Sequence, residues 1–182
     1  MKTAIRNRIA VLVLILTVVV ASNASADVKN VQHAATISVP AILELSADTS
    51  SFTLTMPDFI SGTESNTKTV VYTVRSNDMQ VADGGTVMDA AIDFDYDRLA
   101  LKGQVGSYTA TAGGNTGLTA AAAGYMTIST TNVALAKKAN TTAGSDGKIL
   151  KGTLPVTYKA VATADVPAGD QTHLLFVNIT SR

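Results

Sequence analysis

The chain contains no cysteine and no tryptophan among its 182 residues. Without cysteine there is no disulfide, no thiol chemistry and no thiolate ligand for a structural zinc ion. A chain of this length can nevertheless bury enough apolar surface to fold without disulfides. The absence of tryptophan removes the ring best suited to stack on a sugar. Only four prolines are present, so the position of each one carries information.

The first 26 residues have the order of charge and hydropathy of an export signal. Met1–Arg8 holds three basic residues and no acidic one, and Ile9–Val20 is almost uninterruptedly apolar. That apolar run is too short to cross a bilayer comfortably, which disfavours the alternative of an N-terminal membrane anchor. Small residues follow at Ala24-Ser25-Ala26. We therefore expect a signal peptide cleaved between Ala26 and Asp27, and a protein exported to the cell surface or beyond.

The charge of the remaining chain is mildly acidic. The full sequence balances fourteen basic against fourteen acidic residues, and the signal peptide takes away three of the basic ones. Eleven basic residues against fourteen acidic ones leave a net charge of about −3 and no basic patch. Nucleic acid is therefore not an expected partner.

Short segments of alternating apolar and polar residues dominate the sequence. The clearest are Lys68–Arg75, Ile149–Ala162 and His173–Thr180, and Tyr125–Thr130 is a shorter example. Side chains alternate between the two faces of a strand, so each segment predicts a strand with one buried face. In the last of the long segments both faces are apolar for a few residues, which predicts a strand covered on both sides.

Elsewhere the pattern is weaker. Ser51–Met56 and Val87–Leu101 also alternate and predict strands, whereas Ala120–Ala123 and Val133–Ala139 favour one or two helical turns each. Seven or more short strands with turn signals between them, and no long amphipathic helix, predict an all-β fold of the β-sandwich type.

Three carboxylates alternate along one predicted strand. Asp93, Asp95 and Asp97 have the spacing of the first ligands of a calcium-binding loop, but Arg98 and Gln104 stand where such a loop needs glycine and glutamate. The pattern favours the solvent-facing side of a strand over a calcium site, and no metal site is predicted.

No catalytic motif stands out. The two histidines, His33 and His173, lie in no recognisable nucleophile motif, and no acidic pair suggests a glycosidase. The sequence predicts a protein that is not an enzyme and needs no cofactor.

The first strand is preceded by a separate extended arm. In the stretch Val28–Leu45 the apolar alternation changes phase at Pro40. Proline has no N–H and cannot sit within a paired ladder, so it separates an arm from the first core strand, Ala41–Ser46. The arm carries one regular apolar face, formed by Val31, His33, Ala35, Ile37 and Val39. A strand attached in this way can pair elsewhere.

These ends resemble fimbrial subunits of the chaperone–usher type. The arm, Pro40 and the strand to Leu45 look like the start of colonisation-factor-type pilins, which also lack cysteine. The ending, from Val166-Pro167-Ala168-Gly169-Asp170 to the strand closing on Asn178-Ile179-Thr180-Ser181-Arg182, is similar to pilins and spore-coat-U-like subunits. The resemblance covers both ends of the chain but hardly reaches 112–147. This chain also lacks a recognisable penultimate tyrosine and the disulfide common in many pilins.

The resemblance implies an incomplete immunoglobulin-like β-sandwich completed by an arm from another copy. The expected organisation is a signal peptide (1–26), a donor arm (27–40) and the sandwich (41–182). The five apolar-face residues of the arm would be the donor side chains, with His33 the weaker one, and Leu175, Val177 and Ile179 would line the acceptor groove. The implied function is a homopolymeric cell-surface fibre for adhesion or biofilm, with a periplasmic chaperone, an outer-membrane usher and an unidentified surface receptor as further partners.

Two other functions remain open at this stage. The arm could fold back on its own sheet, which would give a monomeric secreted matrix or carbohydrate-binding protein. A secreted hydrolase is a third hypothesis, which activity on polysaccharides would reveal.

We expect the exported protein to begin at Asp27, because the small-residue cleavage pattern ends at Ala26. Intact-mass spectrometry of surface or secreted protein checks this directly. A mass that retains Ile9–Val20 would instead indicate a membrane-anchored protein.

Overall fold

The computed structural model describes residues 34–140 and 147–182. The chain divides into two units, Met1–Ser38 and Val39–Arg182, and every described strand lies in the second. In the first unit only residues 34–38 are described, and they are exposed and form no strand. The expected cleavage site at Ala26 and Asp27, and the donor positions Val31 and His33, lie outside the described residues.

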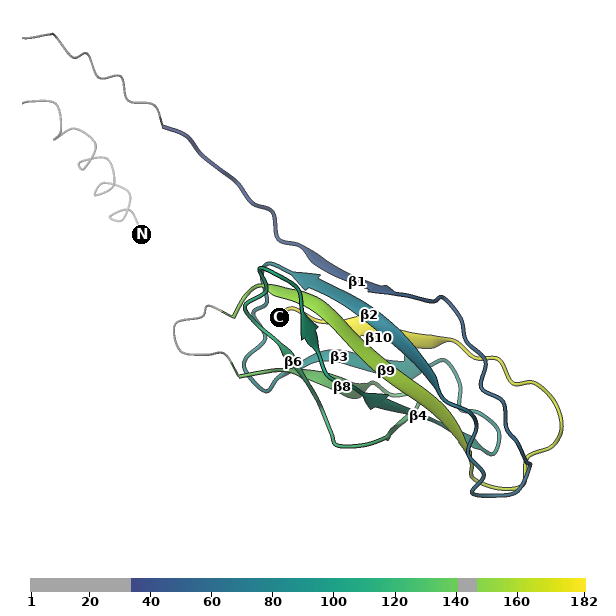
Figure 1. The fold of residues 1–182 in the computed structure, drawn as a ribbon. Helices are drawn as coiled ribbons and strands as arrows, with labels where there is room; N and C mark the ends of the chain where they lie inside the picture. Colours follow the sequence, from purple (N-terminus) through teal and green to yellow (C-terminus); the bar gives the residue numbers. More distant parts are fainter. Residues whose placement is uncertain (1–33, 141–146) are drawn as a thin grey trace, which may run out of the picture. The chain divides into compact units, whose positions relative to one another are not determined.

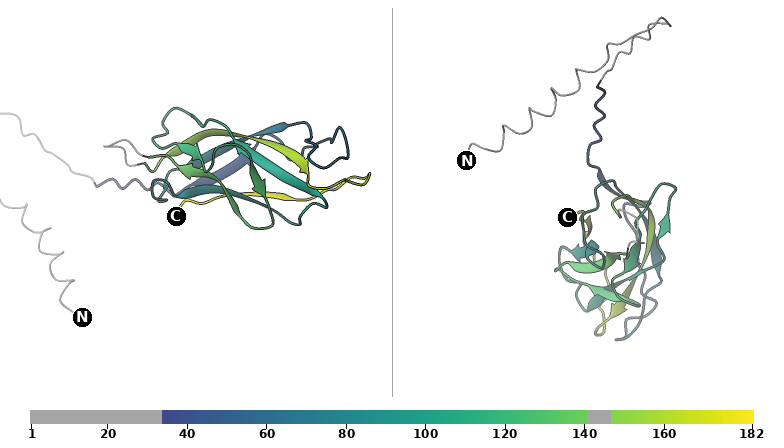
Figure 2. Two further views of the ribbon diagram at one scale, coloured as in Figure 1. Left: turned by 90° about the horizontal axis from the view of Figure 1, so that it is seen from below. Right: turned by 90° about the vertical axis from the view of Figure 1, so that its left-hand side faces the viewer.

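The second unit consists of two antiparallel sheets that face each other (Figures 1 and 2). The first sheet has the order β1 (Leu43–Ala47), β2 (Lys68–Ser76), β9 (Leu150–Ala162), β4 (Leu99–Val105) and β7 (Met126–Ile128), and β5 (Thr109–Ala110) also pairs with β9. The second has the order β10 (Leu175–Ile179), β3 (Thr86–Ile92), β8 (Val133–Lys138) and β6 (Leu118–Ala120). The described residues contain no helix, which confirms the all-β prediction, and the arrangement is that of a β-sandwich.

The centre of the core is built from the longest strand. β9 alternates buried and half-buried residues over most of its thirteen positions and pairs with β2 along its first nine. Leu154, Val156 and Tyr158 are fully buried on its inner face. The Tyr158 hydroxyl is 2.9 Å from that of Tyr72 on β2, so each buried hydroxyl has a partner. Burial raises the pKa of both phenols, which stay neutral.

The sandwich has two distinct ends, which we call the base and the tip. At the base β1 and β9 begin and β2 and β10 end, and the backbone bonds from Asn77 to Ile42, Met79 to Lys148 and Gln80 to Ser181 tie these segments together. The tip is the opposite end and consists of the connections 48–67, 93–98, 129–132 and 163–174. In Figure 1 the tip lies at the lower right, where the long β1–β2 and β9–β10 connections meet.

The strongest strand predictions are confirmed. Lys68–Arg75 corresponds to β2, Ile149–Ala162 to β9, and Tyr125–Thr130 contains β7. The helical prediction for Val133–Ala139 is wrong, because this segment is β8 and pairs with β3, with Asp89 opposite Ala134. Leu135 and Ala136 are fully buried. Pairing and burial there outweigh the helix propensity of the Ala, Leu and Lys residues.

Ser51–Met56 keeps the alternation of a strand but not the pairing. Phe52, Leu54 and Met56 are half-buried between exposed neighbours, yet no strand is assigned to them. Within the segment, the Thr55 N–H donates to the Asn66 side chain and the Thr55 carbonyl accepts from the Asn66 N–H, whereas Ser51 bonds only to the nearby Thr49 side chain. The strand prediction for this segment is therefore wrong.

Two further strand predictions fail. Val87–Leu101 is not one strand, because a turn over residues 93–98 separates β3 from β4, and Arg98 has a φ of 58° there. The three aspartates therefore lie in a turn and not on a strand face. The last predicted strand is not covered on both sides: the inner face of β10 is half-buried, whereas Phe176 and, just before the strand, Leu174 are 48% and 62% exposed on the other face.

We expect Leu154→Ala to lower the free energy of unfolding by about 2–5 kcal/mol, because it removes a fully buried side chain from the centre of β9. Urea titration followed by circular dichroism measures this change. Lys68→Ala on the neighbouring strand β2 removes an exposed side chain and serves as the control, with an expected change of about 0.5 kcal/mol or less. Equal effects of the two substitutions would contradict the assignment of the core.

Candidate functional site

One side of the sandwich is bordered by two edge strands. β1 is the outermost strand of the first sheet and β10 that of the second, and within the described ranges no strand pairs with the outer edge of either. An edge strand presents a row of N–H and C=O groups without ladder partners. The side between β1 and β10 therefore offers two backbone edges at once.

A groove runs between these two edges. A cavity of about 490 Å³ is lined by Leu45 of β1, by Leu175 and Val177 of β10 and by Tyr72 beneath them. A second cavity of about 720 Å³ continues toward the tip. The two share Phe52, Tyr96, Leu101, Thr172 and His173 in their linings, so together they form one continuous groove.

The apolar side chains that border the groove are incompletely covered. Leu45, Leu175, Val177 and Ile179 pack against the core but remain half-buried, and no residue of β1 is fully buried. Phe52 stacks on Tyr158, with ring centroids 5.1 Å apart. Of the three predicted acceptor residues, Leu175 and Val177 line the groove, while Ile179 packs against the core outside the two cavities.

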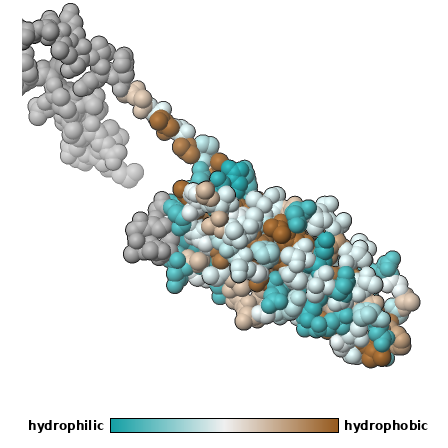
Figure 3. Space-filling model, in the orientation of Figure 1, coloured by the Kyte–Doolittle hydropathy of each residue, from teal (hydrophilic) through white to brown (hydrophobic). Residues whose placement is uncertain are grey.

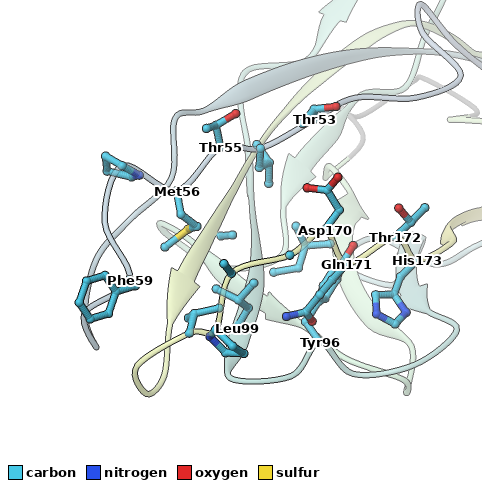
Figure 4. A pocket seen from close by; sticks show the side chains of 18 of the residues that line it. Thr53, Thr55, Met56, Phe59, Tyr96, Leu99, Asp170, Gln171, Thr172 and His173 are labelled. Atoms are coloured by element: carbon cyan, nitrogen blue, oxygen red, sulfur yellow. The ribbon is translucent and has the colours of Figure 1, made fainter.

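The half of the groove nearer the tip has two walls that come from different connections. Thr53, Thr55, Met56 and Phe59 form one wall from the β1–β2 connection, and residues 170–173 form the opposite wall (Figure 4). Asp170 and Gln171 belong to this second wall. Both halves of the groove are lined by apolar and polar groups, so an extended occupant can bury apolar side chains there and also meet polar groups with its backbone or side chains.

His173 lies where the two halves meet. Its Nδ1 is 3.3 Å from Oδ1 of Asp93, and its ring makes an edge contact with Tyr96 at 4.3 Å between centroids. Oδ1 of Asp93 also accepts the backbone N–H groups of Phe94 (2.9 Å) and Leu174 (3.0 Å). Asp93 thereby links the β3–β4 turn to the start of β10 and holds the imidazole in the groove wall.

The same contacts alter the acidity of Asp93. Partial burial of the carboxyl acts to raise its pKa, but the two backbone N–H donors, together with His173, outweigh this and lower the pKa below the usual value. The aspartate triad of the sequence is not assembled: Asp93 is engaged by His173, whereas Asp97 contacts its neighbour Arg98 at 4.0 Å. Across 34–140 and 147–182, no three His, Asp or Glu side chains gather as they would around a metal ion.

The base end of β1 is held by one side chain that the sequence analysis did not single out. Asn77 donates from Nδ2 to the Pro40 carbonyl at 2.8 Å and accepts the Ile42 N–H at 2.7 Å. The turn sequence Ser76-Asn77-Asp78 could have indicated this role, since asparagine side chains in turns often form hydrogen bonds with nearby backbone groups. Residues 39–42 carry no turn, so the chain passes Pro40 extended.

The described donor positions are exposed. Ile37 and Val39 are 89% and 74% exposed, and Ala35 is exposed as well.

In the described part of the chain no helix is both long enough and apolar enough to span a membrane. Comparison of the chain with protein-family models, curated proteins and solved structures found no match.

We expect Asp93→Asn to destabilise the fold at neutral pH and to do so less as the pH falls. The lowered pKa means that the carboxylate stabilises the folded state fully above its unfolded pKa of about 3.9, and that this contribution disappears as the pH drops through the lower folded value. Urea titrations of both proteins between pH 7 and pH 3 measure the difference. A difference that stays constant over this range would contradict the assignment.

Proposed function

We propose that this chain is the structural subunit of a cell-surface fibre that polymerises by strand donation. The arm of one copy fills the groove of another and completes an immunoglobulin-like sandwich. The observation that carries the proposal is the groove between β1 and β10, where two unpaired backbone edges flank half-covered apolar side chains.

An extended segment fits the chemistry of the groove. A strand between β1 and β10 pairs with an edge on either side and turns every second side chain toward the core. The arm repeats apolar residues at this spacing up to Val39, and Leu175, Val177 and Ile179 repeat at the same spacing on β10. Val28–Val39 spans about 40 Å when extended, enough for both halves of the groove.

The point where the arm is attached sets its direction. The arm joins the sandwich at the base, next to Pro40. In a fibre that extends along the sandwich axis, the arm of one copy enters a second copy from the tip and reaches toward its base. The donated strand then runs antiparallel to β10 and parallel to β1.

Folding back onto its own groove requires the opposite geometry. The arm would run parallel to β10 and reverse direction within residues 39–42, where no turn is present. The residue before a proline also prefers an extended backbone, so a tight reversal at Val39 is disfavoured. The monomeric alternative therefore draws no support from this region.

Donation of this kind is head-to-tail, so it propagates into an open fibre instead of closing as a dimer. Each of Val31, Ile37 and Val39 contributes roughly 1.5–3 kcal/mol on full burial, as an upper bound, with backbone pairing in addition. The proposal is non-enzymatic and involves export through a signal peptide. During export the apolar groove would be vacant, and a periplasmic chaperone and an usher are the partners that would cover it. The proposed role of the fibre is adhesion to a surface receptor or biofilm formation.

We expect deletion of Asp27–Val39 to abolish polymerisation. Fusion of the same segment after Arg182 through a short flexible linker is expected to give a stable monomer. Arg182 lies at the base, so a fused segment can reverse there and run antiparallel to β10. Electron microscopy and size-exclusion chromatography detect the polymer, and thermal unfolding compares the stabilities.

A matched pair of substitutions tests which face of the arm is buried. Ile37→Asp places a charge on the apolar face and is expected to prevent polymerisation, whereas Ser38→Asp places the same charge on the opposite face and is expected to be tolerated. If the truncated chain is as stable as the full-length chain and the full-length chain stays monomeric at high concentration, the proposal is wrong.

A further inference from the structure

The two ends of the sandwich differ in charge. The connections at the tip carry eight acidic residues and one basic residue, Arg98. The acidic ones are Asp48, Asp58, Glu64, Asp93, Asp95, Asp97, Asp165 and Asp170. Adding Lys68 and Lys159 from the adjoining strands still leaves the tip acidic.

The base has the opposite sign. Among the described residues there and at the strand ends that meet it, six are basic and three acidic. The basic ones are Arg75, Lys137, Lys138, Lys148, Lys151 and Arg182, and the acidic ones are Glu44, Asp78 and Asp83. The side chain of Arg182 is 77% exposed and touches Asp78 only at 3.4 Å. The sandwich is therefore polarised along its length.

The tip also exposes large apolar side chains. Phe59 and Ile60, in the β1–β2 connection, are 61% and 52% exposed. In Figure 3 a hydrophobic patch lies at the lower right end of the visible face, which is the tip. The base exposes Leu43 and Ile149, at 42% and 37%. Both ends thus offer apolar side chains within a charged surround.

The length of the arm leaves no spacer between neighbouring copies. Val39 is the last donor residue, and the carbonyl of the next residue, Pro40, is already bound to Asn77 of its own sandwich. One residue spans at most about 3.6 Å. If Val39 emerges from the groove at the tip of the recipient, the base of the donor must lie directly against that tip.

We infer that the fibre has a second interface between copies. The grounds are the absence of a spacer after the arm, the opposite charges of the two ends and the apolar side chains exposed at both. The acidic, apolar tip of each subunit docks on the basic base of the subunit that donates its arm. This inference rests on the proposed function and adds a contact that strand donation does not itself require. It makes the junction between subunits a charge-complementary joint instead of a free hinge.

The absence of cysteine allows a direct test by crosslinking within the fibre. One cysteine is placed at the base, as Ala41→Cys or Arg182→Cys, and one at the tip, as Phe59→Cys or Ile60→Cys. Assembled fibres are treated with a short bis-maleimide reagent and boiled in detergent. We expect at least one base–tip pair to give a ladder of covalent multimers that contains most of the protein.

The control keeps the base cysteine and moves the other to Thr119, an exposed position on β6 at the far edge of the second sheet. This pair, and each single-cysteine variant, is expected to give no ladder. Fibres that form normally while all four base–tip pairs resemble the controls would overturn the end-to-end interface and leave strand donation intact. Failure of the unsubstituted chain to form fibres would overturn both.

Discussion

A strand at the edge of a sheet must find partners for its backbone groups, and this requirement organises the structure. β1 and β10 are the two edge strands of one side of the sandwich, and within the described residues no strand pairs with the outer edge of either. The apolar residues on their inner faces, such as Leu45 and Val177, are consequently only half-buried. The centre of the first sheet differs, because β9 and β2 pair over nine residues and bury side chains of their inner faces, such as Val74 and Leu154. The sandwich is well packed at its centre, but its apolar residues are incompletely covered along the groove between β1 and β10.

The alternation of apolar and polar residues predicted those strands that have one buried face and one solvent-exposed face. β2 and β9 are examples, and their limits differ from the predicted ones by a single residue. The prediction failed where pairing over a distance decides the outcome. β8 is a strand because it pairs with β3, and the local sequence of Val133–Lys138 does not indicate that pairing. Ser51–Met56 alternates without a ladder, because within the described residues no strand pairs with it.

The groove was predictable on one wall only. Leu175 and Val177 follow from the alternation in the last strand, and both line the groove. Other parts of the lining come from Phe52, Tyr96 and His173, which lie in connections and are brought together only by folding. Asp93 was interpreted as part of a solvent-facing triad, whereas the turn at Arg98 directs it to His173 and Leu174. The polarity of the two ends was equally hidden, because each end collects residues from segments far apart in the sequence.

The hydrogen bonds of Asn77 have a mechanical consequence. Because this side chain grips the backbone on both sides of Ala41, a pull on the arm is passed to β1 at the base. β1 is joined to β2 by five paired positions along its length. A force along the strand axis loads this ladder in shear, so its bonds share the load and do not break one after another as in peeling. Resistance to pulling is governed by the rate of unfolding. The same amide that shapes the entry of the chain thus acts as the anchor through which tension enters the domain.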